Sequence, residues 1–219
     1  MKHTYDALAP IYDALVDSTV IETTINLITQ HASHGRVLEV GCGTAAVSRR
    51  LASRGYTVDA FDDSDAMLDA AAYHIGQEGV RVNLFRHDAR EAYAGGYDVV
   101  VMAVDVINHF VTTKDLTAAL RHAEAALNPG GLLVFDALTA DYLESLIGHK
   151  ETIEVDGELW TWTVEADDEA VLHRIEAGST SYQHRERLYP LEEILKRVPM
   201  LEEVDRVKTD SRTHLVLKK

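Results

Sequence analysis

The chain has 219 residues, of which 46% are hydrophobic. This length and composition predict a single domain over residues 1–219, because the chain is too short for two domains. A formal net charge of −15 disfavours nucleic acid as a partner, because neutralising phosphates requires a basic face. The single cysteine, Cys42, excludes an intrachain disulfide and a cysteine-based zinc site, and it favours a reducing cytoplasm as the location.

The first residues lack the apolar core of a secretion signal, and no later run approaches membrane-spanning length. We therefore expect a soluble protein without a membrane partner. Aromatic and acidic residues mix over residues 5–17, just before a predicted helix. Thr19 and Glu22 form a capping-box pattern at the start of that helix, and isoleucines at helical spacing should pack it against a sheet.

Residues 36–45 predict a strand, a tight turn and a helix. The apolar residues before the turn suit a strand buried on both faces, while Gly41 and Gly43 allow a ligand to approach the backbone. The turn lacks the lysine of triphosphate-binding loops, and Ala45 interrupts the glycine pattern of dinucleotide folds, so an adenosine-bearing ligand fits better. Packing alone remains the competing explanation for the glycines.

The next predicted strand, residues 56–61, ends at Asp62, about 20 residues after the glycines, where a carboxylate can reach ribose hydroxyls. Ser64 is expected to cap a third helix. A third strand around residues 80–84 then leads to Asp88, for which a surface turn is the alternative role. This alternation of strands and helices predicts an α/β fold with a largely parallel sheet.

Residues 97–104 form the most apolar run of the chain and predict a central strand. Open parallel sheets bind ligands beyond the carboxyl ends of their strands, so residues 105–110 should face the reacting group. His109 is the candidate general base in this segment, because an imidazole accepts a proton near neutral pH. A histidine that only packs at a strand end is an equally common arrangement.

A further helix is expected to stop at residues 128–131, and a fifth strand over residues 132–135 follows. From residue 150 the spacing changes to strict alternation, which predicts antiparallel strands over residues 150–190, inserted after the fifth strand and roofing the substrate pocket. Asp156 and Gly157 suit a hairpin turn. A short helix and a pair of strands are expected to complete the chain.

Two features of the predicted insert have alternative explanations. Trp160 and Trp162 alternate along one strand, and sheet packing is a more common role for such a pair than a cage around a substrate. The charged run over residues 184–187 is interpreted as a solvated face. Alternatively, His184 or Glu186 reaches into the pocket.

Five motifs, in this order and spacing, resemble those of the class I S-adenosylmethionine-dependent methyltransferases, in the branch that includes sugar-amine and amino-acid N-methyltransferases. The motifs are Tyr5-Asp6 through Tyr12-Asp13, Leu38-Glu39-Val40-Gly41-Cys42-Gly43-Thr44, Asp62 to Leu68, His87-Asp88-Ala89 and Leu127 to Gly131. The resemblance implies a Rossmann-like seven-stranded, mostly parallel sheet with helices on both faces. It also implies S-adenosyl-L-methionine as cofactor and a small-molecule acceptor, with an amine ahead of a hydroxyl.

The resemblance assigns residues to the site. Tyr12 should lie near the transferred methyl group and, with His109, forms the catalytic pair. The expected cofactor contacts are Tyr12, Glu39, Gly41, Cys42, Gly43, Asp62, Asp63, Met67, Asp88, Ala89 and Val104. For Tyr12, packing beneath its own helix is the alternative role.

A metal-assisted mechanism would need clustered oxygen ligands, which Asp105, Asn108 and Asp136 offer at adjacent strand ends. The paired Asp-Asn signature of metal-dependent methyltransferases is missing, because Asp136 is followed by Ala137. We therefore expect no metal. Two other functions compete with methyl transfer: a nicotinamide-dependent oxidoreductase, which would use the same glycines and acid, and a non-catalytic module that binds S-adenosylmethionine.

Overall fold

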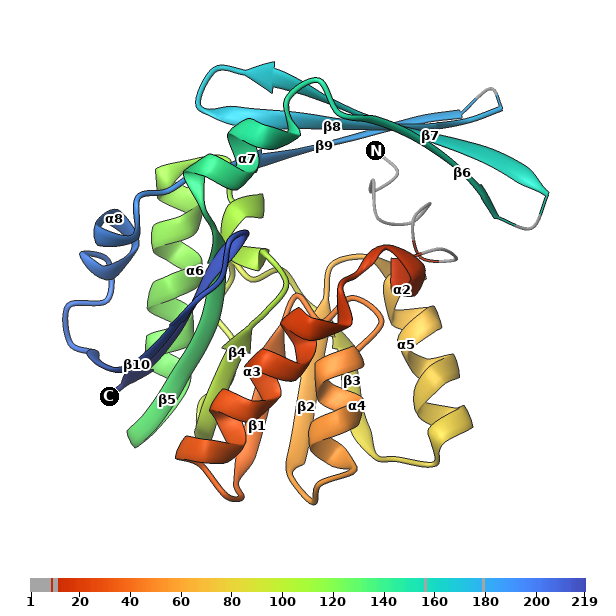
Figure 1. Cartoon of the computed structure of the whole chain (residues 1–219). Helices are drawn as coiled ribbons and strands as arrows, with labels where there is room; N and C mark the ends of the chain where they lie inside the picture. Colours follow the sequence, from red (N-terminus) through yellow and green to blue (C-terminus); the bar gives the residue numbers. More distant parts are fainter. Residues whose placement is uncertain (1–8, 10–11, 156, 179) are drawn as a thin grey trace.

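The structure is a computed structural model that describes residue 9 and residues 12–155, 157–178 and 180–219. The Tyr5-Asp6 part of the N-terminal motif and Asp156 of the predicted hairpin turn lie outside the described residues. The described chain contains a seven-stranded sheet and a separate four-stranded sheet. In Figure 1 the smaller sheet lies across one edge of the larger one.

The larger sheet has the strand order β10-β11-β5-β4-β1-β2-β3. Five neighbouring strands, from β5 to the edge strand β3, run parallel, whereas β11 pairs antiparallel with β5 and β10 pairs antiparallel with β11. This confirms the Rossmann-like, mostly parallel sheet. The strands are β1 (Arg36–Val40), β2 (Thr57–Asp62), β3 (Val82–Arg86), β4 (Tyr97–Met102), β5 (Leu127–Leu138), β10 (Glu202–Lys208) and β11 (Arg212–Lys218).

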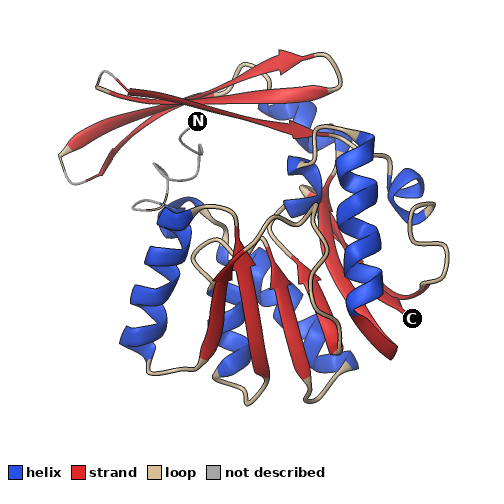
Figure 2. Ribbon diagram, turned by 180° about the vertical axis from the view of Figure 1, so that it is seen from behind, coloured by secondary structure: helices blue, strands red, loops and turns tan. Residues whose placement is uncertain are grey.

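Helices cover both faces of this sheet, as Figures 1 and 2 show from opposite sides. Apolar side chains of α3 and α4 pack on one face and those of α6 and α8 on the other. Along β5, Val134 joins the first of these cores and Phe135 the second, because neighbouring side chains of a strand point to opposite faces. The helices are α2 (Tyr12–Leu15), α3 (Ser18–His31), α4 (Ala46–Ala52), α5 (Asp65–Glu78), α6 (Thr113–Ala126), α7 (Ala140–Leu146) and α8 (Leu191–Leu195), with a 3-10 helix η1 (Val106–His109).

The four-stranded sheet is the predicted insert. It follows β5 and α7 and has the order β6-β7-β8-β9, with every pair antiparallel. Its strands are β6 (Lys150–Val155), β7 (Glu158–Asp167), β8 (Ala170–Ala177) and β9 (Thr180–Arg187). Figure 2 shows that it lies above the carboxyl ends of the parallel strands.

Two local expectations are wrong. Thr19 does not cap α3: the side chain of Asp17 accepts a hydrogen bond from the Thr19 backbone N–H at 2.8 Å and is the N-cap. The fifth strand begins at Leu127 rather than at residue 132, because Leu127 already pairs with Tyr97 of β4. By contrast, Ser64 caps α5 as expected and accepts a hydrogen bond from the Met67 backbone N–H.

Within the described residues, every helix is too short or too polar to cross a lipid bilayer.

Candidate active site

The turn after β1 brings the backbone close to two other segments. Gly41 and Gly43 have φ angles of 66° and 51°, values that side chains disfavour. A Cβ atom at Gly41 would lie 2.9 Å from Val106, and one at Gly43 would lie 3.4 Å from Tyr12. Any larger residue would therefore fill the space above the turn, and this cradle fits a ligand that lies against the backbone.

Asp62 closes this turn at the end of β2. Its carboxylate accepts hydrogen bonds from the backbone N–H groups of Gly43, at 2.8 Å, and Ser64, at 3.0 Å. Burial raises the pKa of Asp62, and the two N–H groups oppose that shift. Asp62 is therefore fixed in orientation and retains lone pairs that can accept further hydrogen bonds.

A cavity of about 270 Å³, here called the turn cavity, opens above Gly41 and Gly43. It is lined by most of the residues predicted to bind the cofactor and also by His109, which lies in η1. The predicted residues that it brings together are Tyr12, Gly41, Gly43, Asp62, Asp63, Met67, Asp88, Ala89 and Val104. Asp88 is also held by an ion pair with Arg90, which contributes to a lowered pKa.

Glu39 and Cys42 lie on the other side of the turn and line a smaller cavity of about 120 Å³. Glu39 is buried and accepts hydrogen bonds from the backbone N–H and the hydroxyl of Ser48 in α4. Burial raises the pKa of Glu39 to about 7 despite these hydrogen bonds. The Cys42 side chain packs among small residues of β2 and α5, so it contributes shape rather than a polar group.

A third cavity of about 580 Å³ lies between the two sheets and is here called the inter-sheet cavity. The large sheet contributes Leu138 and Arg212, the loop after β4 contributes Asp105, and the insert contributes Trp162 and Glu186. Both predicted tryptophans line it, and Trp162 also packs against Leu138 and Val164, so the pair combines packing with a wall of the cavity.

Tyr12 and Val104 line all three cavities and mark the place where the cavities meet. Burial raises the pKa of Tyr12 well above its ordinary value, and the charges of Asp105 and Asp62 add to this shift. The phenol therefore stays protonated and can act as a hydrogen-bond donor at this junction.

The loop after β4 has an unusual backbone. Val104 and Asp105 have φ angles of 61° and 58°, in the left-handed region. A β-branched residue such as valine rarely adopts this conformation. The next residues form η1, and η1 carries His109 to the edge of the turn cavity.

Arg212 holds this loop in place from β11. Its guanidinium forms ion pairs with Asp105, at 2.6 Å, and with the fully buried Asp136 at the end of the predicted fifth strand. Asn108 links the same region to the insert, because its amide donates to the Arg187 carbonyl and accepts from the Leu138 N–H. These oxygen groups therefore have structural partners.

The charged run over residues 184–187 is not a solvated face. Glu186 is buried and the His184 side chain is only 14% exposed, and both line the inter-sheet cavity. Arg185 and Arg187 point the other way and pair with Asp167 and Glu169. The alternation of a strand divides the run, so only half of it faces solvent.

Three residues that line the inter-sheet cavity were not predicted from the sequence: Arg212, Tyr142 and His173. They come from β11, α7 and β8. No spacing in the sequence joins these segments. The only available signal was a charged or polar residue within a predicted apolar strand, as at His173 and Arg212.

A parallel sheet with a glycine turn, an acid at the end of the second strand and cavities at the strand tips is an arrangement typical of α/β enzymes that bind nucleosides. Residues 37–131 match the family model of a methyltransferase domain. The chain is 25% identical over 203 residues to YqeM of Bacillus subtilis, whose methyltransferase activity is itself inferred, and the match covers 86% of this chain and 82% of that protein.

Another relative matches over a shorter stretch of the chain. A ubiquinone biosynthesis O-methyltransferase of Shewanella pealeana is 29% identical over 119 residues, which cover 52% of this chain and about half (49%) of that protein. Among solved structures, an S-adenosylmethionine-dependent methyltransferase of Clostridium acetobutylicum has a TM-score of 0.82 at 22% identity, covering 98% of both chains. CalS10, an amino pentose methyltransferase of Micromonospora echinaspora, has a TM-score of 0.72 at 19% identity and covers 90% of this chain and 89% of its own.

Residues 37–131 therefore match a methyltransferase domain, and the chain shares the fold of solved S-adenosylmethionine-dependent methyltransferases.

Proposed function

We propose that the protein transfers the methyl group of S-adenosyl-L-methionine to a small-molecule acceptor and that this acceptor is an amine rather than an alcohol or phenol. The observation that carries the choice is the charge of the inter-sheet cavity. Its described lining residues include five carboxylates and a single guanidinium, which favour a cation over a neutral hydroxyl compound. The carboxylates are Asp17, Asp105, Glu151, Glu154 and Glu186, and the guanidinium is that of Arg212.

Relatives offer both chemistries. CalS10 is named for an amino pentose, whereas the Shewanella relative is named as an O-methyltransferase. The acidic lining supports the first of these chemistries for this chain. The insert, residues 150–187, would roof the acceptor site within the single domain.

The cofactor site that we propose comprises the turn cavity and the small cavity beside it. The carboxylate of Asp62 would hold the ribose, while Asp88 and Ala89 would lie at the adenine edge. Gly41, Cys42 and Gly43 would contact the ligand through their backbone, and Glu39 would face the amino-acid end. Asp63, Met67 and Val104 would complete the wall, and the position of Tyr12 at the junction of the cavities supports a place beside the methyl group.

The chemistry needs little beyond positioning and a proton acceptor. When bound, S-adenosyl-L-methionine supplies a methyl group on a positively charged sulfur, and the acceptor nitrogen takes that methyl as the carbon–sulfur bond breaks. An ammonium ion has no lone pair, so one proton must leave before the nitrogen can react. His109 would accept that proton at an imidazole nitrogen, and Tyr12 would orient the acceptor through its hydroxyl.

Turnover with a labelled methyl donor tests this function. We expect label in some members of a panel of small amines and none in the matched alcohols and phenols. His109→Ala should lower kcat by about 10²-fold or more, because general-base assistance is worth roughly 10²–10⁴-fold. His34→Ala, an exposed histidine before β1, is the matched control and should leave the rate unchanged.

Labelling of phenols alone would overturn the amine assignment. An unchanged rate in His109→Ala would remove this residue from the role of base and leave methyl transfer itself standing.

A further inference from the structure

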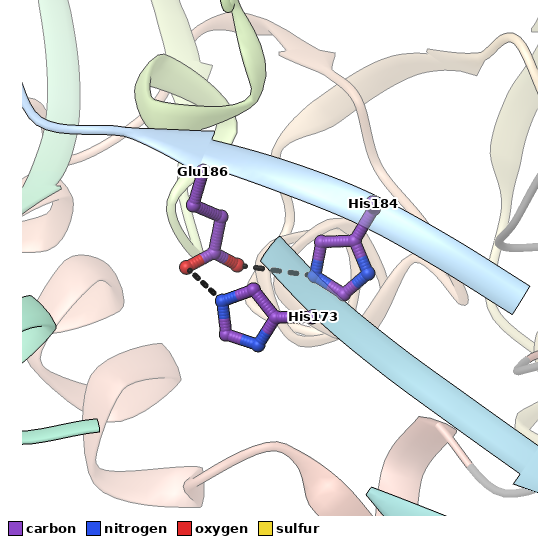
Figure 3. A group of neighbouring side chains, drawn as sticks. All are labelled: His173, His184 and Glu186. Carbon is purple, nitrogen blue, oxygen red and sulfur yellow. Dashed lines mark ion pairs between the residues drawn. The ribbon is translucent and has the colours of Figure 1, made fainter. Parts of the chain in front are cut away.

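Three side chains of the insert form a buried cluster on the wall of the inter-sheet cavity. His173 of β8 and His184 of β9 are directly opposite each other across the strand pair. Their rings stack with centroids 4.5 Å apart and planes 3° from parallel. Glu186 lies on the same face of β9, and Figure 3 shows its carboxylate directed at both rings. The Nε2 atoms of His173 and His184 lie 3.2 and 3.4 Å from its two oxygens.

Two imidazoles and a carboxylate at these distances match the composition of a metal site. Ligand atoms of a tetrahedral zinc ion, at bond lengths of about 2.0–2.1 Å, lie roughly 3.3 Å from each other. The spacing of the nitrogen and oxygen atoms therefore does not distinguish a metal site from a hydrogen-bonded cluster. The position of the proton on the His173 ring distinguishes the two.

Trp162 determines where His173 carries its proton. The indole Nε1–H of Trp162 lies 3.1 Å from Nδ1 of His173 and can only donate. His173 Nδ1 must therefore accept, and the proton of the neutral ring lies on Nε2, where it faces Glu186. A metal would need that same Nε2 without a proton, and metal-bound histidines usually donate from their other nitrogen rather than accept. The cluster is accordingly a directed chain: Trp162 donates a hydrogen bond to His173, and Nε2 of His173 lies against the Glu186 carboxylate at 3.2 Å.

This chain fixes the charge of Glu186. Burial alone would raise the pKa of its carboxyl group, but hydrogen bonds from His173 and His184 outweigh that effect and hold the pKa well below its usual range. The carboxylate therefore stays anionic although it is buried. A nitrogen of His109 and a carboxylate oxygen of Asp105 lie with it in a group whose atoms are all within 4.8 Å of one another.

We propose that Trp162 and His173 position Glu186 as the carboxylate that receives the ammonium group of the acceptor, beside His109. This inference rests on the proposed amine acceptor and adds the residue that selects it. Glu186 holds the cation, His109 takes the proton, and the indole and imidazole of the chain act only by fixing the direction in which the carboxylate points.

The hydrogen-bond chain has a test that requires no acceptor. Long-range ¹H–¹⁵N spectra of the imidazole groups, with His173 assigned by the variant His173→Gln, report which ring nitrogen carries the proton. We expect Nε2–H in the wild type. Trp162→Phe removes the donor and should move His173 to a mixture of tautomers, whereas the matched change Trp160→Phe should leave the tautomer as it is.

A proton on Nδ1 in the wild type, or an unchanged tautomer in Trp162→Phe, would overturn the chain. Stoichiometric binding of zinc chloride that is lost in Glu186→Gln would also overturn it, because a metal site requires the other tautomer.

The acceptor role is tested with an amine that the enzyme methylates. Glu186→Gln should raise the KM for that amine by about 10- to 100-fold, as expected for a lost hydrogen bond to a charged group. Trp162→Phe should raise it by less, with a smaller change in kcat than in KM. Glu176→Gln, an exposed glutamate on β8, is the control and should leave both constants unchanged.

The two proposals fail differently. An unchanged KM in Glu186→Gln, with amines still methylated, rejects the role of Glu186 and leaves the function in place. Failure of every amine rejects the proposed acceptor class and the ammonium site together, while the tautomer of His173 still decides the hydrogen-bond chain.

Discussion

Glu39 is a buried acid at the end of β1 whose protonation is coupled to folding. Its pKa is raised to about 7, first because burial disfavours the charged form and further because Asp62 is nearby. Between the ordinary pKa of about 4.5 and this value, the folded protein binds more protons than the unfolded chain. The contribution of Glu39 to stability therefore falls as the pH rises through this window.

Glu39→Gln should remove this dependence. The amide mimics the protonated acid and can still accept the hydrogen bond from Ser48. We expect the variant to match the wild type near pH 4.5 and to gain up to about 3 kcal/mol in the free energy of unfolding above pH 7, at 1.36 kcal/mol per unit of pKa. Urea denaturation at several pH values measures this. A gain that is equal at all pH values would contradict the assigned cause, and Glu144→Gln provides an exposed control.

The charged run of β9 shows what single residues reveal in a sequence and what they do not. The alternation predicted a strand, and a strand predicts that His184 and Glu186 share a face. It does not predict which face is covered, because the covering groups are Trp162 of β7 and η1, which are distant in sequence. The choice of a solvated face for the whole run was wrong for this reason.

β5 and β11 are joined at one end by buried charges as well as by backbone pairing. Arg212 of β11 neutralises Asp136, whose pKa is still raised to about 6 because burial outweighs the arginine. Replacing one member of such a group leaves the others uncompensated. The cost of losing Arg212 therefore depends on whether Asp136 can take up a proton.

Arg212→Met should lower the free energy of unfolding by about 3–5 kcal/mol at pH 8, the range for a broken buried ion pair. The loss should be smaller at pH 5, where Asp136 becomes neutral. Arg206→Met on β10 breaks the exposed pair with Glu203 and should cost at most about 1 kcal/mol. An equal loss of unfolding free energy in the two variants would contradict this account. So would a loss in Arg212→Met that is the same at pH 8 and pH 5.

The order and type of most elements follow from local patterns. Buried strands, glycine turns and the shift to alternation at residue 150 predicted the sheet, the covering helices and the insert, and the structure confirms them. The first and last residues of the elements were predicted less accurately than their order and type. Asp17 rather than Thr19 is the N-cap of α3. Helix α6 already ends at Ala126, so residues 128–131 lie within β5. The residue at which a helix or strand begins or ends depends on hydrogen bonds to neighbouring segments.

The arrangement of the two sheets determines which cavities the molecule contains. The turn cavity is built by the large sheet, the inter-sheet cavity needs both sheets, and Tyr12 borders both cavities. Most of the residues predicted to bind the cofactor line the turn cavity, because they follow strands one after another. The sequence did not predict Arg212 and His173 because only the folded chain brings β11 and β8 to the same cavity.

Cofactor binding should stabilise the whole chain. S-Adenosylhomocysteine at about 100 times its Kd should add roughly 2.7 kcal/mol. For a chain of this size this corresponds to a rise in Tm of about 5–10 °C. NADH at the same concentration should produce no shift. Stabilisation by NADH alone, measured by differential scanning fluorimetry, would contradict the site described here.

The backbone of Val104 and Asp105 has a consequence for how this enzyme can evolve. A left-handed torsion costs a residue with a side chain about 1–3 kcal/mol, and here two such residues are adjacent. The rest of the fold bears that cost to keep η1 in one orientation. Selection for heat resistance alone would favour relaxing the pair, whereas the proposed role of His109 in turnover favours keeping it. At Val104 and Asp105, thermal stability and the proposed turnover therefore place opposite demands on the backbone.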